Sequence, residues 1–551
     1  MKKLTFLIAF TMLAGMAFSS GLLTNTNQSA QFIRMMSRNA SLGIDAVYFN
    51  PAGLIKLQNG WHFAFSNQSV FQTKTVNSGF QFLNDGYYEG KVTAPVFPSA
   101  FAVYKKNNWA FSMGFGPIGG GGAAEFERGL PSFEIPISKV VPGLAGLKQI
   151  SDKYDVTGYD ADLYFQGSSI FWGIQVGATY KISEVFSVFG GVRYMPSVNA
   201  YEGSIKNIQL QVAGQMHPAS GWLDQTSGEV NAISQQAAGA ANIYYGGAQQ
   251  VQPIIDGGGG NYNLQQLEGA GKITALERAQ IEGGLKLLGI PQENIDAMPM
   301  STIQGTYKTA GDTYDATSKK LAGVATSLSE TGGQLGDKEV DVEQTGAGIT
   351  PIIGINISPN EDWNIGIKYE HKTYMTLKNK TKKDDLGLFP DGADVNSDVP
   401  GFISVGVGYR GVKKLEVQFS YNMYLNKGVD WGFNIRDKSH REVDGNGFDT
   451  GLGLQYSITD NFAFSVGALY ADMKVADSYQ SDFSYSLPSF TPAAGIEWGL
   501  GERLVLDAGV SNTFYFDKEV TFTDPDVGPY KETYGKSTLV FAVGLSYSIF
   551  K

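Results

Sequence analysis

Large apolar side chains alternate with small or polar ones along many stretches of the chain. Between Trp109 and Gly116 every odd-numbered residue is large and apolar, and every even-numbered residue is small or polar. The same alternation recurs at residues 170–180, 363–370, 415–423 and 539–549. Because successive side chains of a strand point to opposite faces, this period of two predicts β-strands with one apolar face.

About fourteen such strands are predicted, and an even number would return both ends of a barrel chain to the same side of a membrane. We expect them to begin near Trp61, Phe97, Trp109, Leu163, Phe186, Glu339, Trp363, Phe402, Leu415, Phe448, Phe462, Phe490, Leu504 and Thr538.

The links between the predicted strands alternate between tight turns and long polar excursions. The tight turns lie at residues 105–108, 182–184, 358–361, 411–413, 458–460 and 499–502. A large soluble β protein also has alternating strands, but here the polar face carries Lys, Glu, Gln, Asn and Gly, and the apolar face ends in Trp or Tyr. Strands that are apolar outside and polar inside, with short turns on one rim and long loops on the other, are typical of outer-membrane barrels. The predicted fold class is therefore all-β, a transmembrane antiparallel β-barrel of about 14 strands with long, partly helical extracellular loops.

The start of the chain has the pattern of an export signal. Lys2 and Lys3 precede an apolar stretch from Leu4 to Phe18, and small residues follow where cleavage is usual. No later stretch is apolar for the roughly 18 residues that a membrane helix needs. We expect residues 1–20 to be a signal peptide and the mature protein to lie in the outer membrane of a Gram-negative bacterium.

Composition removes several classes of function. The chain has 69 Gly, 34 Phe, 28 Tyr and 7 Trp but no Cys, and its formal net charge is −11. Without Cys there is no disulfide framework, thiol nucleophile or thiolate metal site. The modest negative charge argues against a nucleic-acid partner.

No motif for catalysis or metal binding stands out. The four His residues are scattered without ligand spacing. The run Gly257–Gly260 lacks the Lys-Ser/Thr of a phosphate loop, and the acidic residues between Asp391 and Asp398 miss the EF-hand spacing. We expect no catalytic residues, no metal and no cofactor, and therefore no enzyme.

The longest insertion, from about Ser204 to Asp337, is rich in Gly, Gln, Ala and Ser and looks partly flexible. Within it, Leu276, Ile281, Leu285 and Leu288 roughly follow helical spacing, and Gly289 and Pro291 end the segment. These apolar residues are either the local core of a loop or a landing surface for an apolar ligand.

The segment between the signal and the first strand carries a family resemblance. Asn27-Gln28-Ser29-Ala30 and Ala40-Ser41 through Asp45-Ala46 to Asn50-Pro51-Ala52-Gly53-Leu54 resemble the N-terminal region of the FadL family, outer-membrane transporters of long-chain fatty acids and other hydrophobic compounds. The resemblance implies a fourteen-stranded barrel whose N-terminal segment folds inside as a hatch. Residues 21–57 would be this hatch and residues 58–551 the barrel, with large extracellular loops at 119–160 and 204–337. Asn50, Pro51, Ala52 and Gly53 are then the candidate gating residues.

The family resemblance also implies that the substrate leaves sideways through a gap at a kinked third strand. Here the third predicted strand meets Gly116, Pro117, Gly119 and Gly120. Pro removes a backbone donor and Gly tolerates unusual dihedrals, so pairing should fail near these residues. Alternatively, the strand simply ends there at the extracellular rim.

A carboxylate head group would need a cation in the lumen. By strand parity Arg193, Lys368, Lys372 and Arg410 point inward. They are candidates for this role, although they could equally pair with Glu370, Glu416, Glu497 or Asp507 to hold the hatch.

The function expected is passive uptake of long-chain fatty acids or similar hydrophobic molecules by lateral diffusion through the barrel wall. The partners expected are a hydrophobic small-molecule ligand and outer-membrane lipid, with the protein a monomer. The alternatives are a surface adhesin or structural protein acting through the large insertion, and a general polar porin, which a plugged lumen disfavours.

Overall fold

The computed structural model describes residues 24–550. The predicted signal peptide, residues 1–20, and the first residues of the predicted hatch, 21–23, lie outside this range. The described chain divides into two compact units: a barrel unit of residues 24–140, 161–207 and 337–550, and a helical unit of residues 141–160 and 208–336. No helix in the described part of the chain combines the length and hydropathy needed to cross a membrane.

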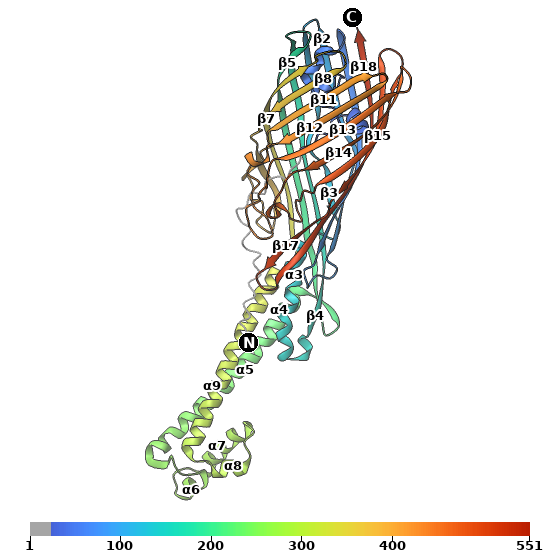
Figure 1. The fold of residues 1–551 in the computed structure, drawn as a ribbon. Coiled ribbons are helices and arrows are strands. Elements are labelled where there is room, and N and C mark those ends of the chain that lie inside the picture. Colours follow the sequence, from blue (N-terminus) through green and yellow to red (C-terminus); the bar gives the residue numbers. More distant parts are fainter. Residues whose placement is uncertain (1–23, 551) are drawn as a thin grey trace. The chain divides into compact units, whose positions relative to one another are not determined.

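The barrel unit is one antiparallel sheet that closes on itself, because β1 pairs with both β2 and β18 (Figure 1). Its first strands are β1 Gly60–Ser78, β2 Tyr87–Lys106, β3 Trp109–Phe126, β4 Val156–Lys181, β5 Phe186–Val212 and β7 Lys338–Ile357. The wall continues with β8 Trp363–Glu370, β9 Thr376–Asp384, β10 Asp394–Asn396, β11 Phe402–Val412, β12 Leu415–Tyr424 and β13 Gly447–Ser457. It ends with β14 Phe462–Asp472, β15 Ser489–Gly499, β16 Leu504–Tyr515, β17 Lys518–Asp524 and β18 Gly528–Phe550.

Three positions in this wall are each built from two strand segments: β8 with β9, β10 with β11, and β16 with β17. Counted in this way, the described sheet is a 14-strand barrel. The short β6, Gln215–Pro218, pairs only with the far end of β5. The predicted all-β barrel is therefore confirmed, and each predicted strand start lies within one of its strands.

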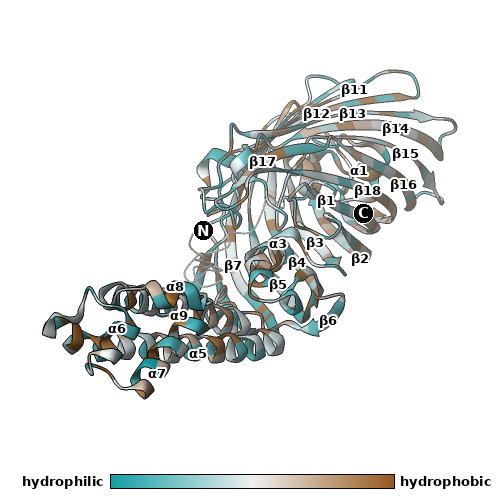
Figure 2. Cartoon of the chain, turned by 90° about the horizontal axis from the view of Figure 1, so that it is seen from below, coloured by the Kyte–Doolittle hydropathy of each residue, from teal (hydrophilic) through white to brown (hydrophobic). Residues whose placement is uncertain are grey.

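An apolar belt covers the outside of the barrel. On β1 the outward side chains Trp61, Phe63, Phe65 and Phe71 are exposed, and on β18 the exposed outward positions run from Leu539 to Ile549. The inward positions between them are buried, as in Ser66 and Gln68 on β1. Figure 2 shows apolar and polar residues following one another along the barrel strands. This arrangement, apolar towards lipid and polar towards the lumen, is that of a transmembrane barrel.

Several strands extend beyond this belt into segments predicted as loops. β3 continues to Phe126 and β4 begins at Val156, so the predicted loop 119–160 is shorter than expected. β5 likewise continues to Val212, beyond the predicted start of the 204–337 loop. Outside a bilayer both faces of a hairpin can be polar, so the apolar alternation fades although backbone pairing continues.

The helical unit consists largely of helices, more of them than the one helical segment expected within the insertion. Its long helices are α5 Ala219–Ile254 and α9 Met300–Gln334, and the shorter ones are α6 Leu264–Gly269, α7 Ala275–Leu287 and α8 Gln292–Ala297. Ser234 Oγ donates to Ser318 O at 2.7 Å and Ser227 Oγ to Ala325 O at 2.7 Å, which makes α5 and α9 an antiparallel pair. Small Ala, Ser, Thr and Gly residues fill this seam, so a search for strongly apolar periodicity misses it.

The belt predicts how single charges affect stability. Leu452 is 49% exposed at the middle of β13, whereas Ile458, 50% exposed, lies at the turn that follows. Leu452→Lys should lower the free energy of unfolding in lipid vesicles by about 2–4 kcal/mol, and Ile458→Lys by about 0–1 kcal/mol, because the cost of a lysine depends on depth. Urea titrations followed by tryptophan fluorescence measure both. Equal effects at the two positions would contradict the placement of the belt.

Candidate functional site

The hatch begins as a chain of short helical turns inside the barrel. α1 Ala30–Met35 is capped by Ser29, whose hydroxyl accepts a bond from Phe32 N, and it ends at Met36 in the left-handed conformation with φ 58°. The stretch Asp45–Leu54 forms α2 Ala46–Phe49 and the 3-10 helix η1 Pro51–Lys56, with Pro51 at the first position of η1. Pro is favoured there because its missing N–H is not needed.

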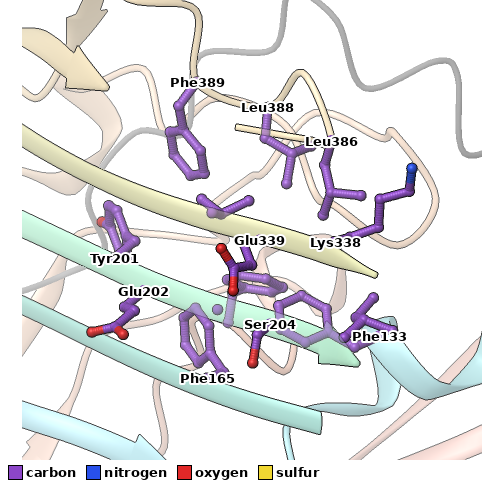
Figure 3. A pocket seen from close by; sticks show the side chains of 14 residues that line it. Phe133, Phe165, Tyr201, Glu202, Ser204, Lys338, Glu339, Leu386, Leu388 and Phe389 are labelled. Atoms are coloured by element: carbon purple, nitrogen blue, oxygen red, sulfur yellow. The ribbon is translucent and has the colours of Figure 1, made fainter. Parts of the chain in front are cut away.

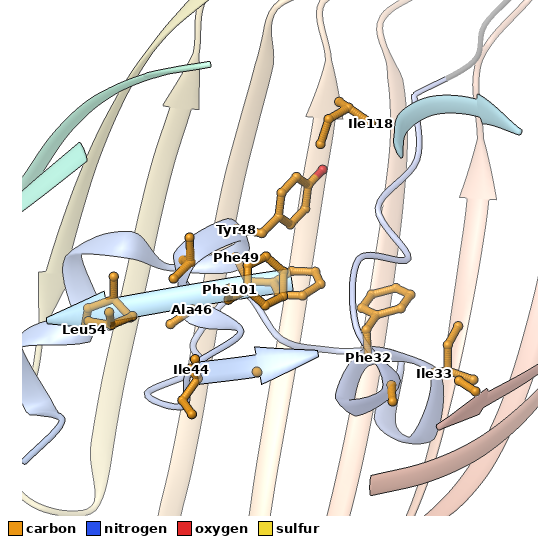
Figure 4. Packing of buried hydrophobic residues seen from close by; sticks show 14 of the residues in the cluster. Phe32, Ile33, Ile44, Ala46, Tyr48, Phe49, Leu54, Phe101 and Ile118 are labelled. Atoms are coloured by element: carbon orange, nitrogen blue, oxygen red, sulfur yellow. The ribbon is translucent and has the colours of Figure 1, made fainter. Parts of the chain in front are cut away.

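Aromatic packing holds the hatch to itself. The rings of Phe32 and Phe49 are stacked with centroids 5.5 Å apart, and Tyr48 meets Phe49 edge-on at 5.0 Å. Phe101 of β2 and Ile118 of β3 belong to the same buried cluster (Figure 4). The hatch therefore shares one apolar core with the first strands of the barrel.

A buried ion pair closes the hatch loop. Arg38 donates to both carboxylate oxygens of Asp45, each at 2.8 Å, and Ser41 Oγ donates to Asp45 Oδ1 at 2.6 Å. Burial raises the pKa of Asp45, but the charge of Arg38 and the bonds from Arg38 and Ser41 outweigh burial and hold this pKa below its usual value.

A second buried arginine fastens the hatch to the barrel wall. Arg34, 1% exposed, donates from Nε to Asp507 Oδ1 at 2.8 Å and from Nη2 to Glu497 Oε2 at 2.6 Å. It also donates to Ser465 Oγ at 2.6 Å. Glu497 and Asp507 are two of the acids expected to pair with cations on the strands. They pair instead with Arg34, which belongs to the hatch.

Two of the head-group candidates are engaged beneath Tyr48. Arg193 and Lys368 both pair with Glu370, Arg193 Nη2 at 2.9 Å and Lys368 Nζ at 2.8 Å from Oε1. Lys368 Nζ also donates to Tyr48 O at 2.6 Å and lies 4.2 Å from the centre of its ring. These contacts match the alternative in which the lumen cations hold the hatch.

The third candidate, Arg410, lies at the mouth of the lumen by the tight turns, on the same side as Glu416. Its side chain is 42% exposed at the end of β11 and pairs with Glu416 at 3.0 Å. It lines a cavity there together with the hatch residues Ala40 and Leu42. Lys372 is likewise occupied, by Asp398 at 2.7 Å.

The predicted gating residues are bonded to strands β4, β5 and β7. Asn50 Nδ2 donates to Asn356 Oδ1 at 2.7 Å and to Ser41 O at 3.0 Å. The carbonyl of Pro51 accepts from Thr179 at 2.7 Å and that of Ala52 from Ser187 at 2.8 Å. At Gly53 a Cβ atom would lie 2.9 Å from Ser41 O, so only glycine fits without movement.

Glycines on the lumen face let the hatch approach the wall. A Cβ at Gly467 would lie 1.9 Å from Met35 O, and one at Gly366 would lie 2.2 Å from Asn39 O. Such distances are impossible, so the hatch backbone occupies space that any other residue would fill. The alternating pattern of the sequence places these glycines on the lumen side. It does not reveal that the hatch backbone packs directly against them.

The barrel wall has a gap between β2 and β3. The strands pair from Lys106↔Trp109 to Ala100↔Phe115 and again at Val92↔Ala124, and pairing is lost between. β3 keeps its pairing with β4 there through two register shifts, at Pro117/Gly119 and Gly120/Ala123. The third strand therefore continues past Gly116, with shifted register on its β4 side and without pairing on its β2 side. That this irregularity is a lateral opening stays a prediction.

The first described residues of the hatch occupy this gap. Thr24 forms a β-bridge with Gly119, and Asn25 N donates to Ile118 O at 2.6 Å. Asn25 Nδ2 donates to Gly120 O at 2.5 Å, and Gln28 Nε2 donates to Pro117 O at 2.8 Å. We call residues Thr24–Gln28 the hatch tail. Its N–H groups donate to carbonyl groups of β3 that receive no hydrogen bond from β2.

A cavity lies beside the tail. Its volume is about 290 Å³, and it is lined by tail residues Thr24–Asn27, by Phe32, Ile33 and Met36 of the hatch, and by Phe97 and Gly121 at the gap. A Cβ at Gly121 would lie 2.6 Å from the ring of Phe97, so this ring packs directly on the β3 backbone. The cavity, the tail and the gap thus adjoin one another.

Further hollows lie in the described part of the barrel unit, among them the following two. An apolar pocket of about 20 Å³ is lined by Phe133, Phe165, Tyr201, Leu388 and Phe389 among others, and it is too small for a ligand (Figure 3). A cavity of about 470 Å³ lies by the tight turns, where Lys56, Arg410 and Trp363 line it. This second hollow is at the periplasmic rim, and the hatch residues Ala40 and Leu42 also line it.

The predicted landing surface on the insertion is not formed. Ile281 and Leu285 are fully buried in the core of the helical unit, and Leu288 packs against that core. Leu276 alone is exposed, at 69%. Three of these four residues therefore belong to a local loop core, the alternative interpretation. They pack with residues of α5, α6, α8 and α9.

Comparison with known proteins rests on structure alone. Neither protein-family models nor curated protein sequences give a match. A Pseudomonas aeruginosa FadL homologue has 13% identity and a TM-score of 0.55, with 96% of this chain and 99% of that chain covered. The Pseudomonas putida toluene transporter TodX has 11% identity and a TM-score of 0.48 over 97% and 100% of the chains. The Ralstonia pickettii toluene transporter TbuX has 14% identity and a TM-score of 0.44 over 96% and 99%. The first of these likenesses establishes a FadL-type barrel fold.

The hatch contacts predict a leak on substitution. Asn50→Ala removes two hydrogen bonds, worth about 1 kcal/mol each, that hold the hatch to β7 and to itself. The barrel should assemble normally, while ion conductance across planar bilayers rises several-fold over the wild type. Asn461→Ala, at an exposed turn, is the matched control. If Asn50→Ala instead fails to assemble, this stretch of the hatch is a structural plug and has no gating role.

Proposed function

We propose that this protein is an outer-membrane transporter that passes hydrophobic small molecules from the outer surface into the bilayer through the gap between β2 and β3. The observation that carries this proposal is the hatch tail, which occupies the gap and also lines the 290 Å³ cavity. A molecule in that cavity touches the segment that closes the wall.

The chemistry of the cavity suits a molecule with an apolar body. Phe32, Ile33 and Met36 form one side and Phe97 stands at the gap. Burial of an acyl chain is favourable by about 0.8 kcal/mol per methylene. The same gain is available in the bilayer beyond the gap, so passage needs no energy source.

The tail is suited to be the moving part. Its bonds to Pro117, Ile118 and Gly120 are made by one backbone amide and two side-chain amides. Each such bond is worth only about 1 kcal/mol, so cargo that gains contact with Phe97 can displace them. The rest of the hatch keeps its ion pairs at Arg34 and Arg38 and remains in place.

The FadL-type fold and the N-terminal sequence resemblance support transport over the alternatives. A polar porin needs an open lumen, whereas here the hatch fills it. An adhesin acting through the insertion needs an apolar or charged face on the helical unit, yet most large apolar side chains of its described part fill its own core. Long-chain fatty acids are the substrates that the resemblance suggests.

A reversible crosslink tests the gap. Thr24 and Gly119 face each other in an antiparallel bridge, a spacing that a disulfide can span, and the chain has no other Cys. The variant Thr24→Cys/Gly119→Cys should lose most uptake of labelled palmitate into proteoliposomes when oxidised and regain it on reduction.

The matched control joins β1 to β18, where Thr73 and Ser537 are partners across a continuous ladder. Thr73→Cys/Ser537→Cys should transport equally well in both redox states. Full uptake by the oxidised Thr24→Cys/Gly119→Cys protein would rule out passage through the gap.

A further inference from the structure

The stretch of β2 that borders the gap is held to the wall from one side. β2 pairs with β3 up to Val92 and again from Ala100, so residues 93–99 have β1 as their paired neighbour among the described strands. We call residues 93–99 the β2 arch. On the β1 side a bulge between Gln68 and Val70 gives the arch one residue more than the strand it faces.

Two prolines leave the backbone of the arch short of regular partners. Pro95 and Pro98 have no N–H to donate, and together with the bulge they interrupt the ladder with β1. Lipid offers no hydrogen-bond partner to a backbone group at this depth. The carbonyl of Pro95 and the N–H of Phe97 therefore need partners within the protein.

Two polar side chains of β1 are these partners. Asn67 Nδ2 donates to Pro95 O at 3.1 Å, and Ser69 Oγ donates to the same oxygen at 2.9 Å. Asn67 Oδ1 accepts from Phe97 N at 3.1 Å. We call Asn67 and Ser69 the clamp, because these three hydrogen bonds hold the arch where the ladder is interrupted.

The clamp lies on the lipid-facing side of the wall, within the apolar belt. Its two residues share the outward parity of Phe65 and Phe71, which are exposed. Across the seam with β18 they face Val543 and Phe541, which are exposed as well. A polar side chain in apolar surroundings is unfavourable unless its groups are bonded, so the bonds to the arch account for polar residues at this depth.

The residue between the two clamp residues contacts the hatch tail on the lumen side. Gln68 is fully buried, its Oε1 accepts from Asn27 Nδ2 at 3.0 Å, and its Nε2 donates to Asn27 O at 2.5 Å. Three consecutive residues of β1 therefore hold the arch on the outside and the tail on the inside.

The two edges of the gap are thus held by different parts of the protein. The β3 edge bonds to the tail through Asn25 and Gln28. The β2 edge bonds to β1 through the clamp, and the backbone held there carries Phe97. The ring of Phe97 packs on Gly121 of β3 and lines the cavity. Loss of the tail bonds would leave the clamp bonds in place.

We propose that Asn67 and Ser69 are positioning residues that fix the β2 edge of the gap and thereby limit the width of the cargo that leaves through it. This inference rests on the proposed transport function and concerns its specificity. A slender acyl chain passes beside a fixed Phe97 ring, whereas a bulky apolar group requires the arch to move away from β3. The clamp opposes that movement.

The mobility of the arch tests the clamp without any transport. Val96, 69% exposed on the arch, is replaced by Cys in this Cys-free chain and labelled with a nitroxide in the full-length protein in lipid vesicles. Electron paramagnetic resonance should show an immobilised label with the native clamp, and a several-fold shorter correlation time in Asn67→Leu and in Ser69→Ala. Ser69→Thr keeps the hydroxyl and should keep the label immobilised.

The selectivity of uptake tests the consequence. Palmitate and a fatty acid with a pyrene group at the end of its chain are offered to proteoliposomes, and the ratio of their uptake rates is measured. The native protein should favour palmitate, and Ser69→Ala and Asn67→Leu should reduce this preference about fivefold, the factor for one lost hydrogen bond. Ser69→Thr should retain the preference. The matched control is Thr73→Val, on the same face of β1 but opposite Lys91, outside the arch, and it should change neither readout.

An immobilised label in Ser69→Ala and Asn67→Leu would overturn the inference, as would an unchanged preference for palmitate. Ser69→Ala removes a single hydroxyl, so it tests the clamp even if Asn67→Leu does not assemble. The crosslink experiment is independent of these results. If oxidation of Thr24→Cys/Gly119→Cys blocks uptake while the clamp variants keep their selectivity, the proposed function stands and only this inference fails.

Discussion

The carbonyl groups of Pro117, Ile118 and Gly120 face a stretch of the wall where β2 gives them no donors. Backbone groups at a membrane barrel wall must be bonded within the protein, because lipid offers no partners. The hatch tail meets this requirement through Asn25 and Gln28. Closure of the wall therefore depends on a segment that belongs to the lumen, and in the function we propose the cargo displaces this segment to reach the bilayer.

The remaining hatch contacts fit the proposal that the tail moves while the rest of the hatch stays in place. Arg34 is tied to the buried Asp507 and to the partly exposed Glu497, and Tyr48 is held between Lys368 and Phe49 in buried surroundings. Breaking a buried ion pair costs about 3–5 kcal/mol, several times the cost of a tail hydrogen bond. The contacts that hold the hatch to the wall are thus stronger in its body than in the tail, which lies at the gap.

Much of the fold could be predicted from the sequence because the bilayer imposes one rule on every strand. Apolar-out alternation located the fourteen positions of the barrel wall, and Pro117 with its flanking glycines lies where β3 shifts its register with β4. The tie at Arg34 could not be predicted, because its partners lie more than four hundred residues away. Parity alone could not show that Arg410 lies at the strand end, half-exposed and paired with Glu416. The pairing of α5 with α9 could not be predicted, because the Ala, Ser and Thr residues between them show no apolar periodicity.

The route of the cargo is the central claim, and photocrosslinking measures it most directly. A palmitate analogue with a diazirine near the end of its chain is loaded into the protein in nanodiscs, irradiated, and located by peptide mass spectrometry. The lateral route predicts adducts at Phe97, at Gly121 and at Phe32. Adducts concentrated at Trp363 and Arg410, which line the cavity at the periplasmic rim, would contradict it and indicate passage straight through the barrel.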